Sequence, residues 1–129
     1  MADMITALHT LIYADDPDAA RAFFRDVLDL PAVDTGGGWL IFKTGPSELG
    51  VHPSSWVFKG ERGSTDQHFD VSLMCDDLDK TVADLKAKGA EFAGGTQDED
   101  WGVTTTLKVP GAGEMTLYQP KYDPPATSR

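Results

Sequence analysis

An internal repeat constrains this chain more than any other feature, because a fold that contains it has to build the same unit twice. Residues 8–31, LHTLIYADDPDAARAFFRDVLDLP, read as a strand, a capped helix and a stop. Residues 69–92, FDVSLMCDDLDKTVADLKAKGAEF, repeat that order further along the chain. A repeat of about sixty residues is too long for one unit of a solenoid and matches half of a small domain.

The first copy carries its own signals for where each element begins and ends. Residues 8–14 mix apolar and β-favouring side chains, which predicts a strand with His9 on one face. Asp16 followed by Pro17 is typical of a helix start, because Asp caps free backbone N–H groups and proline fits the first helical position. The spacing of the apolar residues then predicts a helix over residues 17–28.

The second copy predicts a more complete set of elements. Asp77 caps a helix over residues 78–88, and Gly89 ends it. Strands are expected at residues 69–75, 91–93, 102–109 and 114–119, with a loop at 94–101. The polar, proline-containing residues 121–129 are predicted to fray.

The rest of the first half predicts a hairpin and a connection. After a turn at residues 32–38, strands at 39–44 and 48–52 are expected to pair across Gly45 and Pro46. Residues 53–67 connect the halves, and the apolar run from Trp56 to Phe58 within them predicts a short strand or a lid on a pocket.

Charge and cysteine content exclude several classes of protein. The 129 residues carry 11 basic and 21 acidic side chains, so the formal charge of −10 argues against nucleic acid and anionic membranes as partners. A single cysteine, Cys75, excludes an intramolecular disulfide framework and is expected in the core. No segment resembles a signal peptide or a membrane span, so we expect one cytoplasmic domain over residues 1–129.

The two strand–helix copies and the run WGVTTTLKVPGAGEMTLYQP near the C-terminus resemble the vicinal oxygen chelate superfamily. That superfamily contains glyoxalase I, extradiol dioxygenases, fosfomycin-resistance enzymes and bleomycin-resistance proteins. The resemblance implies an α+β fold of two tandem βαβββ modules, at about residues 5–53 and 68–120. The modules would form a cupped, mostly antiparallel mixed sheet with helices on the outside, and the chain would pair as a homodimer.

The resemblance also implies a divalent metal (Fe, Mn, Ni or Zn) held by the first and last strand of each module. His9 matches the first position, and the repeat puts Asp70 in the equivalent place. The other two positions fall on Gly50 and Thr116, where family enzymes commonly have a carboxylate. Without anionic ligands there, this register makes a poor metal site.

Two catalytic alternatives remain open. A displaced metal site draws on His9, with further ligands from a set that strand alternation places nearby: Glu48, His52, His68, Asp70 and Glu114. In the other, His9 and Asp70 act as a metal-free acid/base pair in a lyase or isomerase. The first of these is the metal-dependent glyoxalase or extradiol-dioxygenase type of enzyme.

Aromatic residues favour a binding protein over either enzyme. Side chains on strand faces or loops are expected to line a mainly apolar ligand pocket: Tyr13, Trp39, His52, Trp56, Trp101, Thr116 and Tyr118. Trp101 follows the acidic residues 98–100, and an acidic rim beside aromatic walls suits a cationic or planar ligand. The sequence therefore predicts a small-molecule-binding protein without a metal cofactor, similar to the drug-binding members of the superfamily.

Overall fold

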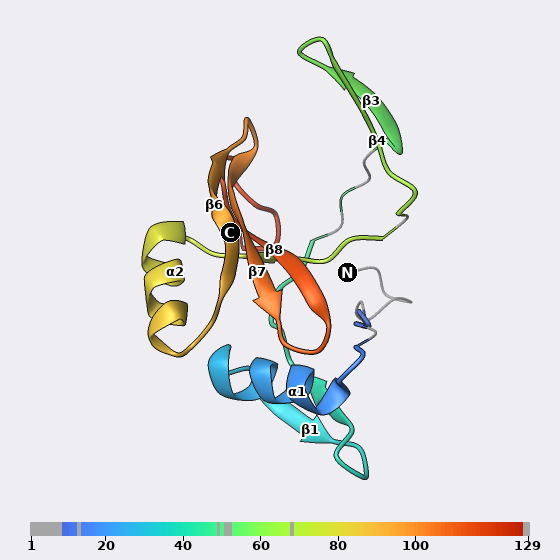
Figure 1. Ribbon diagram of the computed structural model, residues 1–129, viewed down its shortest axis with the longest axis vertical. Coiled ribbons are helices and arrows are strands. Elements are labelled where there is room, and N and C mark those ends of the chain that lie inside the picture. Colours follow the sequence, from blue (N-terminus) through green and yellow to red (C-terminus); the bar gives the residue numbers. More distant parts are fainter. Residues whose placement is uncertain (1–8, 13, 49, 51–52, 68, 128–129) are drawn as a thin grey trace.

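The computed structural model describes residues 9–12, 14–48, 50, 53–67 and 69–127. Its second half has the predicted βαβββ order, with these bounds: β5 Ser72–Met74, α2 Leu78–Ala87, β6 Phe92–Asp98, β7 Gly102–Val109 and β8 Gly113–Pro120. The strands form one sheet in the order β5-β8-β7-β6, in which only β5 runs parallel to its neighbour (Figure 1). The chain is an α+β protein, as the sequence predicts.

Both helices begin at the predicted caps. The Asp77 carboxylate accepts a hydrogen bond from the Lys80 backbone N–H at 3.1 Å, and the Asp16 carboxylate accepts one from the Ala19 N–H at 3.0 Å. Helix α1, Pro17–Ala22, continues as a π-helical segment, η1, Phe23–Val27. The predicted helix over 17–28 is therefore confirmed in extent, while its second part is wound more loosely than an α-helix.

One core holds α1, η1 and α2 against the same face of the sheet. Its buried members are Ala20, Phe23, Leu78, Leu85, Ala90, Leu107, Val109, Met115 and Leu117. The sheet contributes the odd-numbered residues of β7 and β8, because alternate side chains of a strand point to opposite faces. The backbone N–H of Asp16 also donates to the Gly111 carbonyl at 2.9 Å, which joins the start of α1 to the turn between β7 and β8.

In the described part of the first half, the strands form two separate hairpins. Strand β1, Ala32–Asp34, pairs with β2, Leu40–Phe42, and strand β3, Ser55–Phe58, pairs with β4, Glu61–Ser64. The predicted pairing of residues 39–44 with 48–52 lies largely outside the described residues, because 49, 51 and 52 are not among them. In the described part, β2 pairs with the segment before the glycine-rich turn. The Asp34 carboxylate stabilises that turn by accepting from the N–H groups of Gly36 and Gly38.

Three further expectations are corrected. Residues 9–12 and 14 are irregular, although a strand is predicted over 8–14. Strand β6 extends through most of the predicted loop at 94–101. In the predicted frayed tail, Tyr122 and the Ala126 backbone N–H both hydrogen-bond to Glu48. The predicted short strand at Trp56–Phe58 is confirmed as part of β3. Among the described residues, no helix is long and apolar enough to cross a membrane.

Candidate functional site

The face of the sheet opposite the helices carries a row of hydroxyl groups. The register places Ser72 of β5 beside Thr116 of β8, and Thr116 beside Thr106 of β7. Two residues further along β8, Tyr118 pairs with Thr104. We name these five residues the hydroxyl face. The sequence produces it because β7 alternates threonine with buried residues, so that Thr104 and Thr106 point away from the core.

Two aromatic rings meet at one end of the hydroxyl face. The rings of Trp101 and Tyr118 lie 5.2 Å apart, centroid to centroid, at an interplanar angle of 68°, which is an edge-to-face contact. Gly102 lies close to the Tyr118 ring, because a Cβ atom there would come within 2.7 Å of the Gln119 carbonyl oxygen and 3.4 Å of that ring. Tyr118 is buried, whereas Trp101 keeps 48% of its surface exposed. Trp101 is therefore available to stack on a planar ligand.

A chain of hydrogen bonds extends from these rings to the first half of the molecule. The hydroxyl groups of Tyr118 and Tyr122 are 2.8 Å apart, and the Tyr122 hydroxyl donates to Glu48 Oε2 at 2.6 Å. The Ala126 N–H donates to Glu48 Oε1 at 3.3 Å. Burial is the main cause that raises the pKa of Tyr122, and its bonds to Glu48 and Tyr118 raise that pKa further. We name Trp101, Tyr118, Tyr122 and Glu48 the aromatic corner.

The acidic loop beside the aromatic corner is partly neutralised. Lys121 forms an ion pair with Asp98, and Lys59 forms one with Asp100 at 3.2 Å. Lys59 belongs to the turn between β3 and β4, so this pair links that hairpin to the loop between β6 and β7. Glu48, in contrast, has no ion pair with any residue that the structure describes.

The other predicted ligand-binding residues lie elsewhere. Trp39 is exposed in the turn between β1 and β2, where the Arg21 guanidinium lies 5.0 Å from its ring centroid. Trp56 of β3 covers Gly63 of the paired strand. The aromatic corner therefore contains only Trp101 and Tyr118 of the predicted set, and Thr116 is its neighbour on β8. Predictions on Tyr13, His52 and His68 lie outside the described residues.

The residues at the implied metal positions offer few donors. His9 and Asp70 are both exposed in irregular segments, and no hydrogen bond or ion pair joins them in the described chain. Gly50 has no side chain, and Thr116 presents a neutral hydroxyl group within the hydroxyl face. Across the described residues, no three His, Cys, Asp or Glu side chains gather as a metal-ligand group. The donors at these four positions do not fit a divalent ion.

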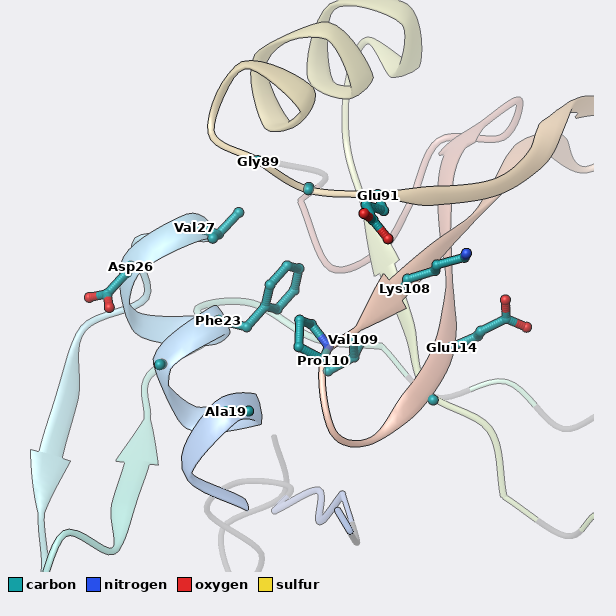
Figure 2. A pocket seen from close by; sticks show the side chains of 13 residues that line it. Ala19, Phe23, Asp26, Val27, Gly89, Glu91, Lys108, Val109, Pro110 and Glu114 are labelled. Carbon is teal, nitrogen blue, oxygen red and sulfur yellow. The ribbon is translucent and has the colours of Figure 1, made fainter. Parts of the chain in front are cut away.

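Glu114, the remaining predicted ligand, is four residues from Tyr118 on β8 and lines a different cavity. That cleft, of about 680 Å³, lies between η1 and the end of the β7–β8 hairpin (Figure 2). Figure 2 shows Phe23 opposite Pro110 and Val109, Val27 directed toward the chain at Gly89, and Lys108 and Glu114 at the margin. Only Phe23, Ala90 and Val109 of its lining belong to the buried core. None of the predicted aromatic residues lines it, whereas Trp101, Thr116 and Tyr118 gather on β8 and the loop before β7, so we place the candidate site at the hydroxyl face and aromatic corner.

Sequence reasoning did not recognise five site residues as ligand-binding: Ser72, Thr104 and Thr106 of the hydroxyl face, and Glu48 and Tyr122 of the aromatic corner. The sequence predicts Glu48 only as a displaced metal ligand, and it places Tyr122 in a tail expected to fray. The two residues are 74 positions apart in the chain, so no local periodicity connects them. The only sequence signal is the pair of tyrosines at 118 and 122, just before and just after the end of the last strand.

A model of the Glyoxalase/Bleomycin resistance protein/Dioxygenase superfamily matches residues 6–116 of the chain. No curated protein sequence matches this chain. Among solved structures, the antibiotic binding protein TnmS3 from a Streptomyces species is similar with a TM-score of 0.61 at 18% identity. That match covers 93% of this chain and 100% of the other.

Two further structures are similar over comparable lengths. A lactoylglutathione lyase from Agrobacterium tumefaciens has a TM-score of 0.60 at 20% identity, covering 88% of this chain and 92% of its own. A protein described by the same superfamily name, from Sphaerobacter thermophilus, has a TM-score of 0.59 at 21% identity, covering 90% and 98%. At these identities the likeness shows the fold alone.

Proposed function

Because this chain belongs to the glyoxalase/bleomycin resistance protein/dioxygenase superfamily, we propose that it is a small-molecule-binding protein that holds an aromatic or cationic ligand without a metal ion. The observation that carries the proposal is the aromatic corner at the end of the hydroxyl face. An exposed indole ring beside Tyr118 offers apolar contact, and Thr104, Thr106 and Thr116 offer hydrogen bonds. Ligand pockets commonly combine apolar walls with a few such polar groups.

The chemistry of the implied metal positions supports binding without a metal. Gly50 and Thr116 stand where a carboxylate ligand is expected, and neither supplies a negative charge at neutral pH. The hydroxyl of Thr116 instead extends the row made by Ser72 and Thr106. In this proposal the residue serves to orient a ligand by hydrogen bonding. The similarity to an antibiotic binding protein agrees with such a role without identifying the ligand.

The first test compares metal content with ligand binding. Elemental analysis of protein that never met a chelating column should find no stoichiometric ion, even after incubation with iron, manganese, nickel or zinc. A screen of aromatic and cationic compounds should shift the backbone amide signals of Thr104, Thr106 and Thr116. An ion present once per chain, and lost in His9→Ala, would contradict the proposal and favour the metal-dependent lyase or dioxygenase.

We further propose that two copies of the chain associate. The described residues expose large apolar side chains on both hairpins of the first half, including Val33, Trp39, Val57 and Phe58. The chain exposes 9774 Å² in all, against ~6,700 Å² expected of a compact monomer of its mass. The excess is larger than the ~800 Å² that each partner buries in a standard interface. Sedimentation equilibrium should give a dimer mass, whereas a monomer at all concentrations would contradict this proposal.

A further inference from the structure

The hydrogen bonds of the aromatic corner run in one direction, and this direction indicates which ligand groups the site prefers. This inference rests on the proposed binding function. A tyrosine hydroxyl has one proton and also accepts hydrogen bonds. The proton of Tyr122 is directed to the carboxylate of Glu48, which can only accept. In the 2.8 Å contact between the two hydroxyl groups, Tyr118 must therefore be the donor. Glu48 thus sets the direction of both hydrogen bonds, and neither Tyr118 nor Tyr122 has a hydroxyl proton left to donate to a ligand.

The hydrogen-bond chain Tyr118–Tyr122–Glu48 has unused acceptor positions but no unused donor. Each oxygen of Glu48 already accepts one bond, from the Tyr122 hydroxyl and the Ala126 N–H, and a carboxylate has about four acceptor positions. Both tyrosine oxygens likewise keep a lone pair. A ligand group that can donate finds partners here, whereas a carboxylate or phosphate meets lone pairs and a negative charge.

The ion pairs around the aromatic corner sharpen this preference. Asp98 and Asp100 are each balanced by a lysine, while Glu48 is held by neutral donors and has no cationic partner among the residues the structure describes. Glu48 is also half-buried, so an unbalanced charge there is less well solvated than one on the surface. An ammonium group would supply the missing countercharge at one end of a hydrogen-bond chain whose other end, Tyr118, contacts the exposed ring of Trp101.

We propose that the Tyr118–Tyr122–Glu48 chain is a specificity-determining subsite, which selects ligands bearing an ammonium or hydroxyl donor next to an aromatic ring and rejects anions. Glu48 acts in it both as the countercharge and as the group that orients the two phenols. Networks of this kind strengthen when their dipoles align, which makes the outermost phenol oxygens better acceptors.

Three probes with one ring system test the subsite: naphthylmethylamine, a cation at neutral pH, naphthylmethanol, which is neutral, and naphthoate, an anion. Calorimetric titration gives each affinity, and backbone amide shifts at Trp101, Thr104 and Tyr118 locate the binding. Hydrogen bonds to charged groups imply that the amine binds about tenfold to hundredfold more tightly than naphthoate. Naphthylmethanol should fall between them, because it donates without carrying charge.

Variants then distinguish the role of Glu48 in orienting the two phenols from its role as a negative charge. Glu48→Gln should bring the affinities for amine and naphthoate to within about threefold of each other, because the amide both donates and accepts and no longer fixes the proton order. Tyr122→Phe should weaken the discrimination while leaving the charge in place. Glu91→Gln makes the same charge change at an exposed residue beside the helix-side cleft and should keep the wild-type ratio.

The outcomes distinguish this inference from the proposed function. Equal binding of amine and naphthoate to the wild type would overturn the subsite and leave the binding function standing. A Glu48→Gln protein that binds all three probes more weakly by one common factor would also overturn it, since Glu48 would then be only structural. If none of the probes shifted the amides of the hydroxyl face, both the subsite and the proposed function would be contradicted.

Discussion

The two halves of the molecule bury their apolar residues to very different extents. In the four-stranded sheet, Leu107 is fully buried and Leu117 is 3% exposed. In the hairpins of the first half, Val33 remains 68% exposed and Val57 65% exposed. Both regions contain antiparallel strands of β-favouring residues, so strand formation alone does not explain the difference. What differs is how fully helices cover one face of the strands: α1, η1 and α2 share a buried core with the sheet, whereas the β1–β2 hairpin contacts η1 through Phe42 and Phe24 and leaves β1 exposed.

That difference shows which part of the chain can stabilise itself. The sheet has α1, η1 and α2 on one face, whereas a two-stranded hairpin is marginally stable in water unless it packs on something else (Figure 1). Of the first-half elements, only α1 and η1 contribute buried residues to the core, through Ala20 and Phe23. The hairpins therefore have the composition of strands that need a further surface, which the proposed second copy would supply.

The largest contrast is expected between two leucines. Leu107→Ala should lower the free energy of unfolding by about 3 kcal/mol, because it removes buried methyl groups and leaves a cavity at the centre of the sheet. Leu11→Ala, at a residue that is 54% exposed, should cost less than about 0.5 kcal/mol. Denaturant unfolding of both variants measures the difference. Equal losses would mean that residues 9–12 belong to the core of the folded protein.

The junction between the halves gives the next largest effect. Gly111 has a φ of 76°, and a Cβ atom there would lie 2.5 Å from the Asp16 carbonyl oxygen. Gly60 has a φ of 80° with nothing within 4 Å of the same position. Gly60→Ala should therefore cost only the backbone strain, about 1 kcal/mol, and Gly111→Ala about 1–2 kcal/mol more. If thermal unfolding finds the two variants equal, α1 does not pack against the β7–β8 turn.

The sequence predicts the second half well because its signals are local. The cap at Asp77, the stop at Gly89 and the alternation in residues 102–109 each lie within a few positions, and the structure has the elements they predict. The partner of β2 could not be read in this way. Residues 39–44 are compatible with a strand on either side, and the described pairing with β1 spans the turn that Asp34 stabilises.

The same distinction between local and non-local signals applies to the residues of the candidate site. The family resemblance selects Thr116, the aromatic side chain on a strand face selects Tyr118, and the position after an acidic loop selects Trp101. Their shared location follows from the register of β7 with β8, which sequence periodicity does not specify. The contact between Glu48 and Tyr122 joins two irregular segments, where no period exists to predict it.

A smaller loss of stability is expected when either helix cap is removed. Asp77→Ala and Asp16→Ala should each lower the free energy of unfolding by about 1 kcal/mol, since each removes one bond to a free backbone N–H. Asp15→Ala removes the same charge from an exposed neighbour and should be nearly neutral. Chemical denaturation measures all three. A silent Asp16→Ala would show that α1 unfolds separately from the sheet.

The smallest expected effect concerns the bond by which the C-terminal segment holds the first half. The pKa of Tyr122 is raised in the folded protein, so the folded state keeps this proton at pH values where the unfolded chain has lost it. The stability that depends on this proton is present in full below the unfolded pKa of about 10 and is lost as pH rises toward the folded value. Tyr122→Phe should therefore make the free energy of unfolding fall less steeply above about pH 10. Because the two proteins differ only at this side chain, the difference between the two curves isolates Tyr122. Identical curves would mean that Glu48 and Tyr118 do not hold the phenol, and that the first half is not tied to the second at this point.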